Sequence, residues 1–396
     1  MGLLNTNLLK SFFSFLLFAQ LFIVQSFGQQ SPGLSNNYQL IVGTYTNSGK
    51  SEGIYTYHFN STTGVAELMG KINTAEPSFL TIEHTGRLVY AVNELGNNKG
   101  AISAFRYNKA NGSLQLLNSV ASGGDHPCYI TTDSKSRYLF VANYTGGSFS
   151  ATRIKDNGMP DTVSQFIQHT GKSITARQEK AHVHSTVLSP DEKYLLVQDL
   201  GMDQISVYAV NLSAMANPVA AKPVSVFNTI PGSGPRHLVF HPLKNIAYSV
   251  QELNGLVNVM RFDNGKLRLL QEITMLEIQE AVHPGSIKDK RTPGAADIHI
   301  SPDGKFLYAS NRGDFNEIVI YAIAANGRLT YTATQSTLGK APRNFGIDPT
   351  GHFLLAGNHL SDEIVIFRRD LKTGRLTDTG NRIKVGAPVC IQFVAD

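Results

Sequence analysis

Six ionisable residues stand out because their side chains suit the chemistry of a small anionic molecule. They are His184, Arg236, Glu252, Arg312, Arg343 and His359. An arginine side chain binds a carboxylate, a phosphate or a developing oxyanion through its planar fork of N–H donors. Histidine and glutamate side chains accept and donate protons. If the fold gathers the six residues, they would form a site that holds an anion and transfers protons.

A sequence repeat of about 50 residues carries these residues at equivalent positions. Each copy begins with an apolar run, passes through a polar turn such as Ser-Pro-Asp-Gly-Lys at 301–305, and enters a second β-rich run. We attribute the aspartate of this turn to turn formation rather than to catalysis. Full copies begin at Pro77, Pro127, Val183, Pro235, Ala295 and Pro342.

Each copy predicts four short antiparallel strands, because a third β-rich run, an Asn-Gly or Thr-Gly turn and a fourth run follow the first two. Such a unit is the blade of a β-propeller. The chain ends on a lone first strand at 387–393, and residues 40–68 supply three strands without a first. We therefore predict an all-β, seven-bladed β-propeller in which the N- and C-terminal strands share one blade and close the ring. An open solenoid is the alternative.

Within a blade, the start of the first strand lies beside the end of the second strand, because the two are antiparallel and joined by a short turn. Two positions of the repeat therefore share one edge, and we expect them to surround one mouth of the central channel. Their charged members are His184, Arg236 and Arg343 on first strands, and Glu94, Glu252, Arg312 and His359 after second strands. The alternatives are a structural Arg236–Glu252 ion pair, a solvated Arg312 and a strand histidine at His184.

A metal site is an alternative use of the histidines. His182 and His184 are two residues apart on a predicted strand and would share one face, with Asp199 as the nearest third ligand. Metal sites need three or four ligands, and the sequence offers no clear fourth. We predict no metal ion, and we assign secondary substrate contacts to Arg343, His359, His182 and Glu94.

Residues 1–28 have the pattern of a secretory signal peptide, because Lys10 precedes an apolar run that small residues follow. We predict an exported protein, periplasmic or secreted, without stable membrane insertion after cleavage; an uncleaved anchor is the alternative. Residues 38–396 would form a single propeller domain. Cys128 and Cys390 allow either two buried thiols or a disulfide. The net charge of +5, without a block of like charge, argues against a nucleic-acid partner.

Several segments, in order along the chain, resemble the seven-bladed β-propeller lactonases, a 6-phosphogluconolactonase-like family related to the carboxymuconate cyclases. The most specific are Gly-Pro-Arg-His at 234–237 and Ser-Asn-Arg-Gly at 310–313. The resemblance covers nearly the whole chain after the predicted signal. It implies that His184, Arg236, Glu252 and Arg312 are the catalytic set, as in the related cyclases. The predicted export signal is a departure from the family, where phosphogluconate chemistry is cytosolic.

The resemblance implies a carboxylic ester hydrolase that opens a small anionic sugar lactone without a cofactor. Arg236 and Arg312 would bind the substrate anion and the oxyanion, and His184 and Glu252 would act as general acid and base. A covalent acyl-enzyme is not expected, because no serine is evident in a nucleophile elbow. Two alternatives remain: a muconate-type lactonizing cycloisomerase that uses the same four residues, and a non-catalytic secreted ligand-binding propeller.

Overall fold

The computed structural model describes residues 37–276 and 292–394, so the predicted signal peptide lies outside the described residues. The described residues form strands grouped into seven blades, and one short 3-10 helix, η1 (Ala176–Gln178), precedes blade 4. The strands are, in blade 1, β28 (Pro388–Val394), β1 (Asn37–Thr44), β2 (Gly53–Asn60) and β3 (Val65–Asn73); in blade 2, β4 (Leu80–Ile82), β5 (Leu88–Asn93), β6 (Ala101–Asn108) and β7 (Ser113–Ala121); in blade 3, β8 (Pro127–Thr132), β9 (Tyr138–Asn143), β10 (Ser148–Ile154) and β11 (Pro160–Gln168); in blade 4, β12 (Val183–Leu188), β13 (Tyr194–Asp199), β14 (Gln204–Ala209) and β15 (Ser225–Asn228); in blade 5, β16 (Pro235–Phe240), β17 (Ile246–Gln251), β18 (Leu256–Asp263) and β19 (Lys266–Thr274); in blade 6, β20 (Ala295–Ile300), β21 (Phe306–Asn311), β22 (Glu317–Ile323) and β23 (Leu329–Ser336); in blade 7, β24 (Pro342–Ile347), β25 (Phe353–Asn358), β26 (Glu363–Arg369) and β27 (Leu376–Lys384).

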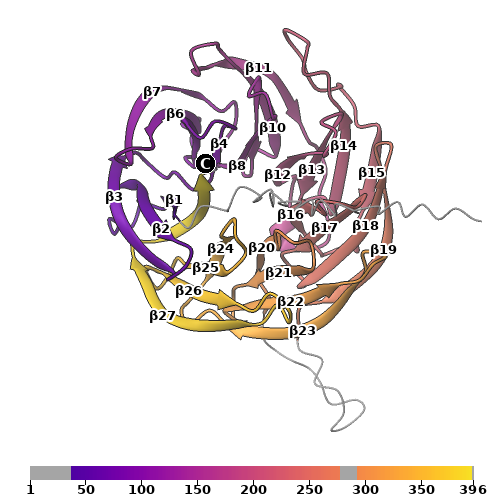
Figure 1. The fold of residues 1–396 in the computed structure, drawn as a ribbon. Helices are drawn as coiled ribbons and strands as arrows, with labels where there is room; N and C mark the ends of the chain where they lie inside the picture. The colour runs from indigo at the N-terminus through magenta and orange to yellow at the C-terminus, as the bar shows by residue number, and fades with distance from the viewer. Residues whose placement is uncertain (1–36, 277–291, 395–396) are drawn as a thin grey trace, which may run out of the picture. The chain divides into compact units, whose positions relative to one another are not determined.

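Each blade is a four-stranded antiparallel sheet, and the seven blades follow one another around a ring (Figure 1). The first strands β28, β4, β8, β12, β16, β20 and β24 contact one another in turn around the centre. The fourth strands are the most exposed of each sheet, as the alternating burial of β3 and β7 shows. The predicted all-β, seven-bladed propeller is confirmed.

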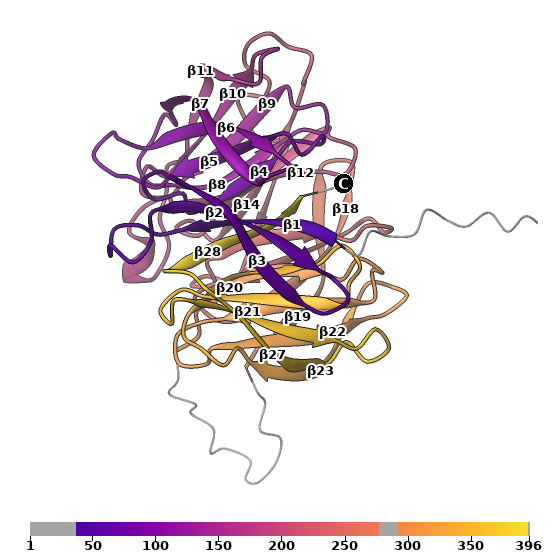
Figure 2. The same ribbon diagram turned by 60° about the vertical axis from the view of Figure 1, so that its left-hand side comes forward.

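The ring closes through blade 1, where the two ends of the described chain pair with each other. Strand β28 runs antiparallel to β1, with Gln39 opposite Val394 and Val42 opposite Ile391. Figure 2 shows the C-terminal β28 beside the N-terminal β1. This pairing gives blade 1 its first strand and covers the edge of β1 that would otherwise lack a partner.

Hydrophobic cores lie between neighbouring blades, and each of the seven pairs of neighbours in the described chain shares one. Tyrosines of second strands add directional contacts between blades. The Tyr90 hydroxyl donates to the Gly158 carbonyl at 2.9 Å, Tyr248 to Gly327 at 2.8 Å and Tyr308 to Gly374 at 2.7 Å. Each of these bonds reaches the outer turn of the next blade, so neighbouring blades are held in register and the channel edge has a defined geometry.

Two further sequence questions have structural answers within the described residues. Cys128 and Cys390 are both buried free thiols rather than a disulfide. None of the described helices has the length and apolar character that a membrane-crossing helix requires.

Candidate active site

A cavity of about 460 Å³ opens where first strands begin and second strands end. All seven blades contribute residues to its wall, which places it on the axis of the ring. Its ionisable and aromatic wall residues are Tyr45, Glu94, Cys128, Tyr144, Arg177, His184, Glu252, Arg312, Arg343 and His359. A larger groove of about 990 Å³ lies between blades 2 and 3 on turns at the opposite strand ends, lined by surface cations such as Arg87 and Lys135. We place the candidate site in the axial cavity, because the ionisable groups converge there from all blades.

β-Bulges aim the second residue of several first strands. In blades 3, 4, 5 and 7 the pairing with the second strand skips one residue, and the skipped residues are Cys128, His184, Arg236 and Arg343. A bulge leaves one residue out of the ladder and redirects its side chain, which is why bulges recur beside active sites. The repeated bulge explains why this one column of the repeat gathers functional side chains at the cavity.

Glu252 is the centre of an ion cluster. Its Oε2 accepts hydrogen bonds from Arg236 Nε at 2.9 Å and lies 3.1 Å from Arg312 Nη2, and its Oε1 lies 2.8 Å from Arg177 Nη1. Burial alone would raise the pKa of Glu252, but Arg312, Arg236 and Arg177 outweigh burial and hold this pKa well below its ordinary value. Glu252 is therefore a fixed carboxylate at neutral pH, and its contacts favour the orientation of arginines over the general acid–base role expected from the sequence.

Arg236 lies behind Glu252 and is not part of the cavity wall, contrary to the expectation that it binds the substrate anion directly. Its side chain is 1% exposed, and Nη1 donates to the Ala296 carbonyl at 2.6 Å and to His237 Nε2 at 3.2 Å. Burial, with Arg312 and Arg343, lowers the pKa of Arg236 to about 10, so it remains a cation at neutral pH. Its contacts with Glu252, the Ala296 carbonyl and His237 fix the Arg236 guanidinium beside the Glu252 carboxylate.

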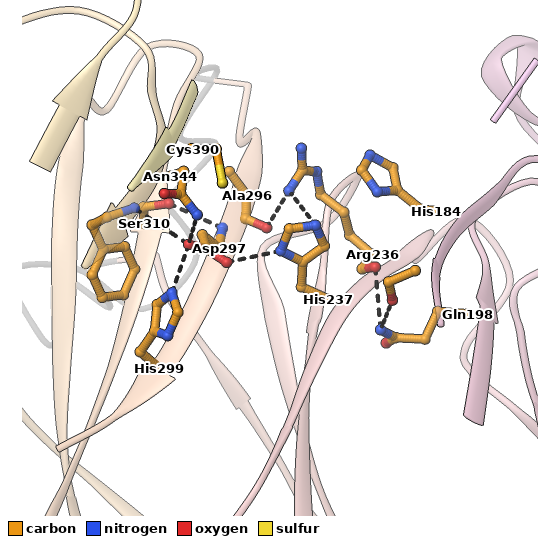
Figure 3. A network of polar contacts seen from close by, with 12 residues as sticks. His184, Gln198, Arg236, His237, Ala296, Asp297, His299, Ser310, Asn344 and Cys390 are labelled. Carbon is orange, nitrogen blue, oxygen red and sulfur yellow. Dashed lines mark hydrogen bonds and ion pairs between the residues drawn. The ribbon is translucent and has the colours of Figure 1, made fainter. Parts of the chain in front are cut away.

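A polar network in the channel holds His237, which in turn contacts Arg236. Figure 3 shows His237 between Asp297 and the Arg236 guanidinium, with Nδ1 at 2.8 Å from Asp297 Oδ1. Burial and Arg236 lower the pKa of His237 to about 4, so the ring is neutral, with Nδ1–H donating to Asp297 and Nε2 accepting from Arg236. Asp297 also accepts from Asn344 Nδ2 at 2.5 Å and contacts His299 Nε2 at 2.8 Å. The carboxylate thus fixes the tautomer that Arg236 requires.

His184 contributes a neutral imidazole to the cavity wall. Its side chain is buried, and burial together with Arg236 and His237 lowers its pKa well below 6.5. Nδ1 lies 3.8 Å from Cys128 Sγ, and Nε2 has no hydrogen-bond partner among the described residues. The ring packs edge-to-face against Tyr144 with centroids 5.4 Å apart. A neutral ring nitrogen that faces a cavity without a protein partner can accept a proton from a bound water molecule.

The opposite side of the cavity carries a second cluster around Tyr45. The Tyr45 hydroxyl donates to Glu94 Oε2 at 2.9 Å, and the Arg343 guanidinium lies 5.3 Å from the Tyr45 ring centroid and 3.9 Å from Glu94 Oε2. Burial and Arg343 lower the pKa of His359 to about 4, and its buried Nδ1 has no partner in the described structure. Glu94, Arg343 and His359 therefore line the cavity, as expected of secondary substrate contacts.

His182 does not join His184. The bulge at His184 breaks the strand alternation on which the predicted shared face depends. His182 stacks on Tyr144, and its ring nitrogens contact the Tyr144 carbonyl and Glu179, each at 3.2 Å. Asp199 is occupied by the backbone N–H of His182 and by His169 Nδ1, each at 2.8 Å. Across the described residues, no group of three or more His, Cys, Asp or Glu side chains is placed to hold a metal ion.

Sequence reasoning missed Arg177, Tyr45, Tyr144 and Cys128 as cavity residues. Tyr144 and Cys128 occupy the same two repeat positions as the charged set, so their positions signalled them although their residue types did not. Arg177 lies on η1, the only helix among the described residues, in the segment that joins blade 3 to blade 4. Ser51 matches the letters Gly-x-Ser-x-Gly at 49–53, but it lies between β1 and β2, outside the cavity wall, with its hydroxyl 2.6 Å from Thr44 Oγ1.

Cys128 is the one thiol in this wall, and we expect Cys128→Ala to keep kcat/KM for the reaction of this site within about tenfold. Burial raises the pKa of its thiol, so the reactive thiolate is not formed at neutral pH. The thiol also lies 3.4 Å from the His184 carbonyl, to which it donates. Steady-state kinetics of the variant checks this, and a loss of about 10⁴-fold or more would instead identify a cysteine nucleophile.

Comparison with known proteins adds an independent finding. The family model described as "Lactonase, 7-bladed beta-propeller" matches residues 39–393. A 6-phosphogluconolactonase of Formosa agariphila is 37% identical over 89% of this chain and 99% of its own, and that of Bacillus subtilis is 30% identical over 89% and 97%. The structure of the Pseudomonas aeruginosa periplasmic gluconolactonase PpgL is similar with a TM-score of 0.83, at 35% identity over 91% of this chain and 99% of its own.

Proposed function

The chain belongs to the family of seven-bladed β-propeller lactonases, and on that basis we propose that it hydrolyses a sugar lactone in its axial cavity. The observation that carries the proposal is the convergence, on one cavity wall, of the neutral His184 imidazole and two arginines with free donors. Arg312 uses Nε for the Gly294 carbonyl and Nη2 for Glu252, so Nη1 has no partner among the described residues. Arg343 contacts Glu94 only at 3.9 Å, through Nη2.

The reaction needs an activated water molecule, a stabilised oxyanion and a proton for the leaving ring oxygen. We assign the base to His184 Nε2, which takes a proton from water as the water oxygen bonds to the lactone carbonyl carbon. Arg312 and Arg343 stabilise the negative charge that develops on the carbonyl oxygen. The carbon–ring oxygen bond then breaks, and the His184 imidazolium returns the proton to the leaving oxygen. The product is an open hydroxy acid.

Glu252 has a different part in this proposal from proton transfer. Its two oxygens already face three guanidinium groups: it orients Arg312 at the cavity wall, pairs with the buried Arg236, and accepts from Arg177 through Oε1. The network from Asp297 through His237 to Arg236 sets the position of that pair. Donors fixed before the substrate arrives need no reorganisation during the reaction, which is the main source of electrostatic catalysis.

The direct experiment measures acid release from glucono-δ-lactone and from 6-phosphogluconolactone above the spontaneous rate, with the wild-type protein and Arg312→Gln. We expect acceleration with at least one lactone and a loss of about 10²-fold or more in the variant. A folded wild-type protein that accelerates neither reaction would contradict the proposal. In that case, turnover of a muconate-type substrate would distinguish the cycloisomerase from a ligand-binding propeller.

We also propose that the protein is exported, to the periplasm or beyond. The supports are the signal-like pattern of residues 1–28 and the 35% identity to a protein described as a periplasmic gluconolactonase. N-terminal sequencing of protein recovered from the cell envelope or the medium is expected to begin near residue 29. Full-length protein in the cytosolic fraction would refute export.

A further inference from the structure

Arg177 combines a fixed backbone with an exposed side chain. Its neighbour Gln178 is fully buried and donates through Nε2 to the Leu200 carbonyl at 2.9 Å, while the Gln178 carbonyl accepts from Ser173 N–H at 3.0 Å. The Arg177 side chain itself is 55% exposed. Because η1 belongs to no blade, the sheet ladder does not set the direction of this side chain. Arg177 therefore places a cationic side chain in the cavity wall, while hydrogen bonds of the neighbouring Gln178 hold its backbone segment in position.

Arg177 is the most easily displaced of the three arginines on Glu252. Arg236 and Arg312 each also donate to a backbone carbonyl, Ala296 at 2.6 Å and Gly294 at 3.0 Å. Among the residues that the structure describes, the Arg177 guanidinium has two polar partners, Glu252 Oε1 at 2.8 Å through Nη1 and the Tyr144 hydroxyl at 3.2 Å through Nη2. Glu252 would keep two guanidinium partners if Arg177 turned to a ligand.

The net charge of the site matches that of a bound dianion. Arg177, Arg312 and Arg343 in the wall and Arg236 behind it carry four positive charges, and Glu94 and Glu252 carry two negative charges, which leaves an excess of two positive charges. His184 and His359 add none near neutral pH, because burial and nearby arginines lower their pKa values. A phosphate monoester carries about −1.5 to −2 at pH 7 and balances this excess. Arginine binds such a group with two parallel N–H···O bonds.

We propose that Arg177 is the phosphate receptor of this cavity: it exchanges Glu252 Oε1 and the Tyr144 hydroxyl for two phosphate oxygens of a phosphorylated sugar lactone. The inference rests on the proposed lactonase function and concerns which residue of its site recognises a phosphorylated substrate. It makes Arg177 a specificity residue, which selects a phosphorylated lactone over a neutral one and takes no part in proton transfer. The exchange also leaves Glu252 with Arg236 and Arg312, which are both anchored to backbone carbonyls, so the catalytic wall stays in place.

The test compares wild type, Arg177→Gln and a matched control, Lys172→Gln, which removes an exposed cation from the same segment outside the cavity wall. Calorimetric titration with 6-phosphogluconate and with gluconate measures binding without turnover. We expect the wild type and the control to bind the phosphorylated acid more tightly, and Arg177→Gln to weaken that binding by about 10- to 100-fold while gluconate binding stays within about threefold. Equal affinity of the wild type for both acids would overturn the inference, whatever the protein hydrolyses.

Kinetics separates recognition from a supporting role. In Arg177→Gln, kcat/KM for 6-phosphogluconolactone should fall by about 10- to 100-fold, mainly through KM, and kcat/KM for glucono-δ-lactone should change by less than about threefold. An equal loss for both lactones would show that Arg177 acts through Glu252 and would reject the phosphate receptor. A wild type that binds 6-phosphogluconate through Arg177 but opens neither lactone would contradict the lactonase proposal alone.

Discussion

The variant His184→Gln is expected to lower kcat/KM for lactone hydrolysis by about 10²- to 10⁴-fold, the usual contribution of a positioned general base. Glutamine fills a similar volume but cannot take a proton from water. The loss should appear mainly in kcat, because the arginines that hold the substrate remain in place. Acid release above the spontaneous rate measures it, and His352→Gln, a change at an exposed histidine on a turn, is the matched control.

The pH profile gives this prediction a second test. The base must be neutral to act, and burial, with Arg236 and His237, places the pKa of His184 well below 6.5. Enzyme-dependent kcat/KM should therefore be constant above pH 6.5 and fall only in more acidic solution. A limb centred at or above pH 6.5, or a His184→Gln variant that keeps more than a tenth of the activity, would exclude His184 as the base.

The fold could be predicted because the sequence contains six copies of the pattern that forms one blade. One copy alone shows only apolar runs and turns, but six copies aligned at equivalent residues define a blade. The unpaired run at 387–393 and the three runs at 40–68 fit together as the seventh, and the pairing of β28 with β1 confirms this. Closure of the ring could be predicted because each end of the chain leaves a strand edge without a partner. Pairing the two ends with each other satisfies both edges.

The location of most candidate site residues could also be predicted, because antiparallel pairing puts the starts of first strands beside the ends of second strands. This rule placed His184, Glu252, Arg312 and Arg343 on one edge, and the structure has them in one cavity wall. The rule could not distinguish Arg236 from the residues that line the cavity. Arg236 occupies an equivalent repeat position, but its side chain lies behind Glu252. The direction of that side chain depends on Ala296 and His237 in neighbouring positions of the channel.

Two parts of the site lacked a sequence signal. Arg177 lies in the segment that joins blade 3 to blade 4, where no repeat register applies and only the buried Gln178 reveals how the loop is held. Asp297 and His237 occupy a first-strand position whose other copies carry the uncharged Phe79, Tyr129, Ser185, Asn344 and Cys390, so their pairing across blades 5 and 6 depends on side-chain direction. The bulge that orients His184 and separates it from His182 also lacked a signal. A bulge depends on how two strands pair, and the sequence of one strand does not show that pairing.

Glu252→Gln is expected to lower the free energy of unfolding by about 3–5 kcal/mol, because removing one partner of a buried ion pair leaves the other charge uncompensated. Arg236 is 1% exposed and would lose its anion. Denaturant unfolding measures the change, and the control Glu52→Gln, which breaks a solvent-exposed pair with Lys71, should leave the free energy of unfolding nearly unchanged. Because the folded-state pKa of Glu252 is lower than 4.5, the wild-type advantage is complete at neutral pH and shrinks as the pH falls below about 4.5.

The double variant Glu252→Gln/Arg236→Met distinguishes a lost anion from a lost shape. If the cost of Glu252→Gln comes from the stranded Arg236 cation, replacing that cation with an apolar side chain of similar length should recover about 2 kcal/mol or more relative to the sum of the single variants. Activity should remain low in the double variant, because Arg312 still lacks the carboxylate that orients it. Additive stability losses would show that Arg236 and Glu252 contribute separately, and high activity in either Glu252 variant would show that the arginines need no carboxylate to hold them.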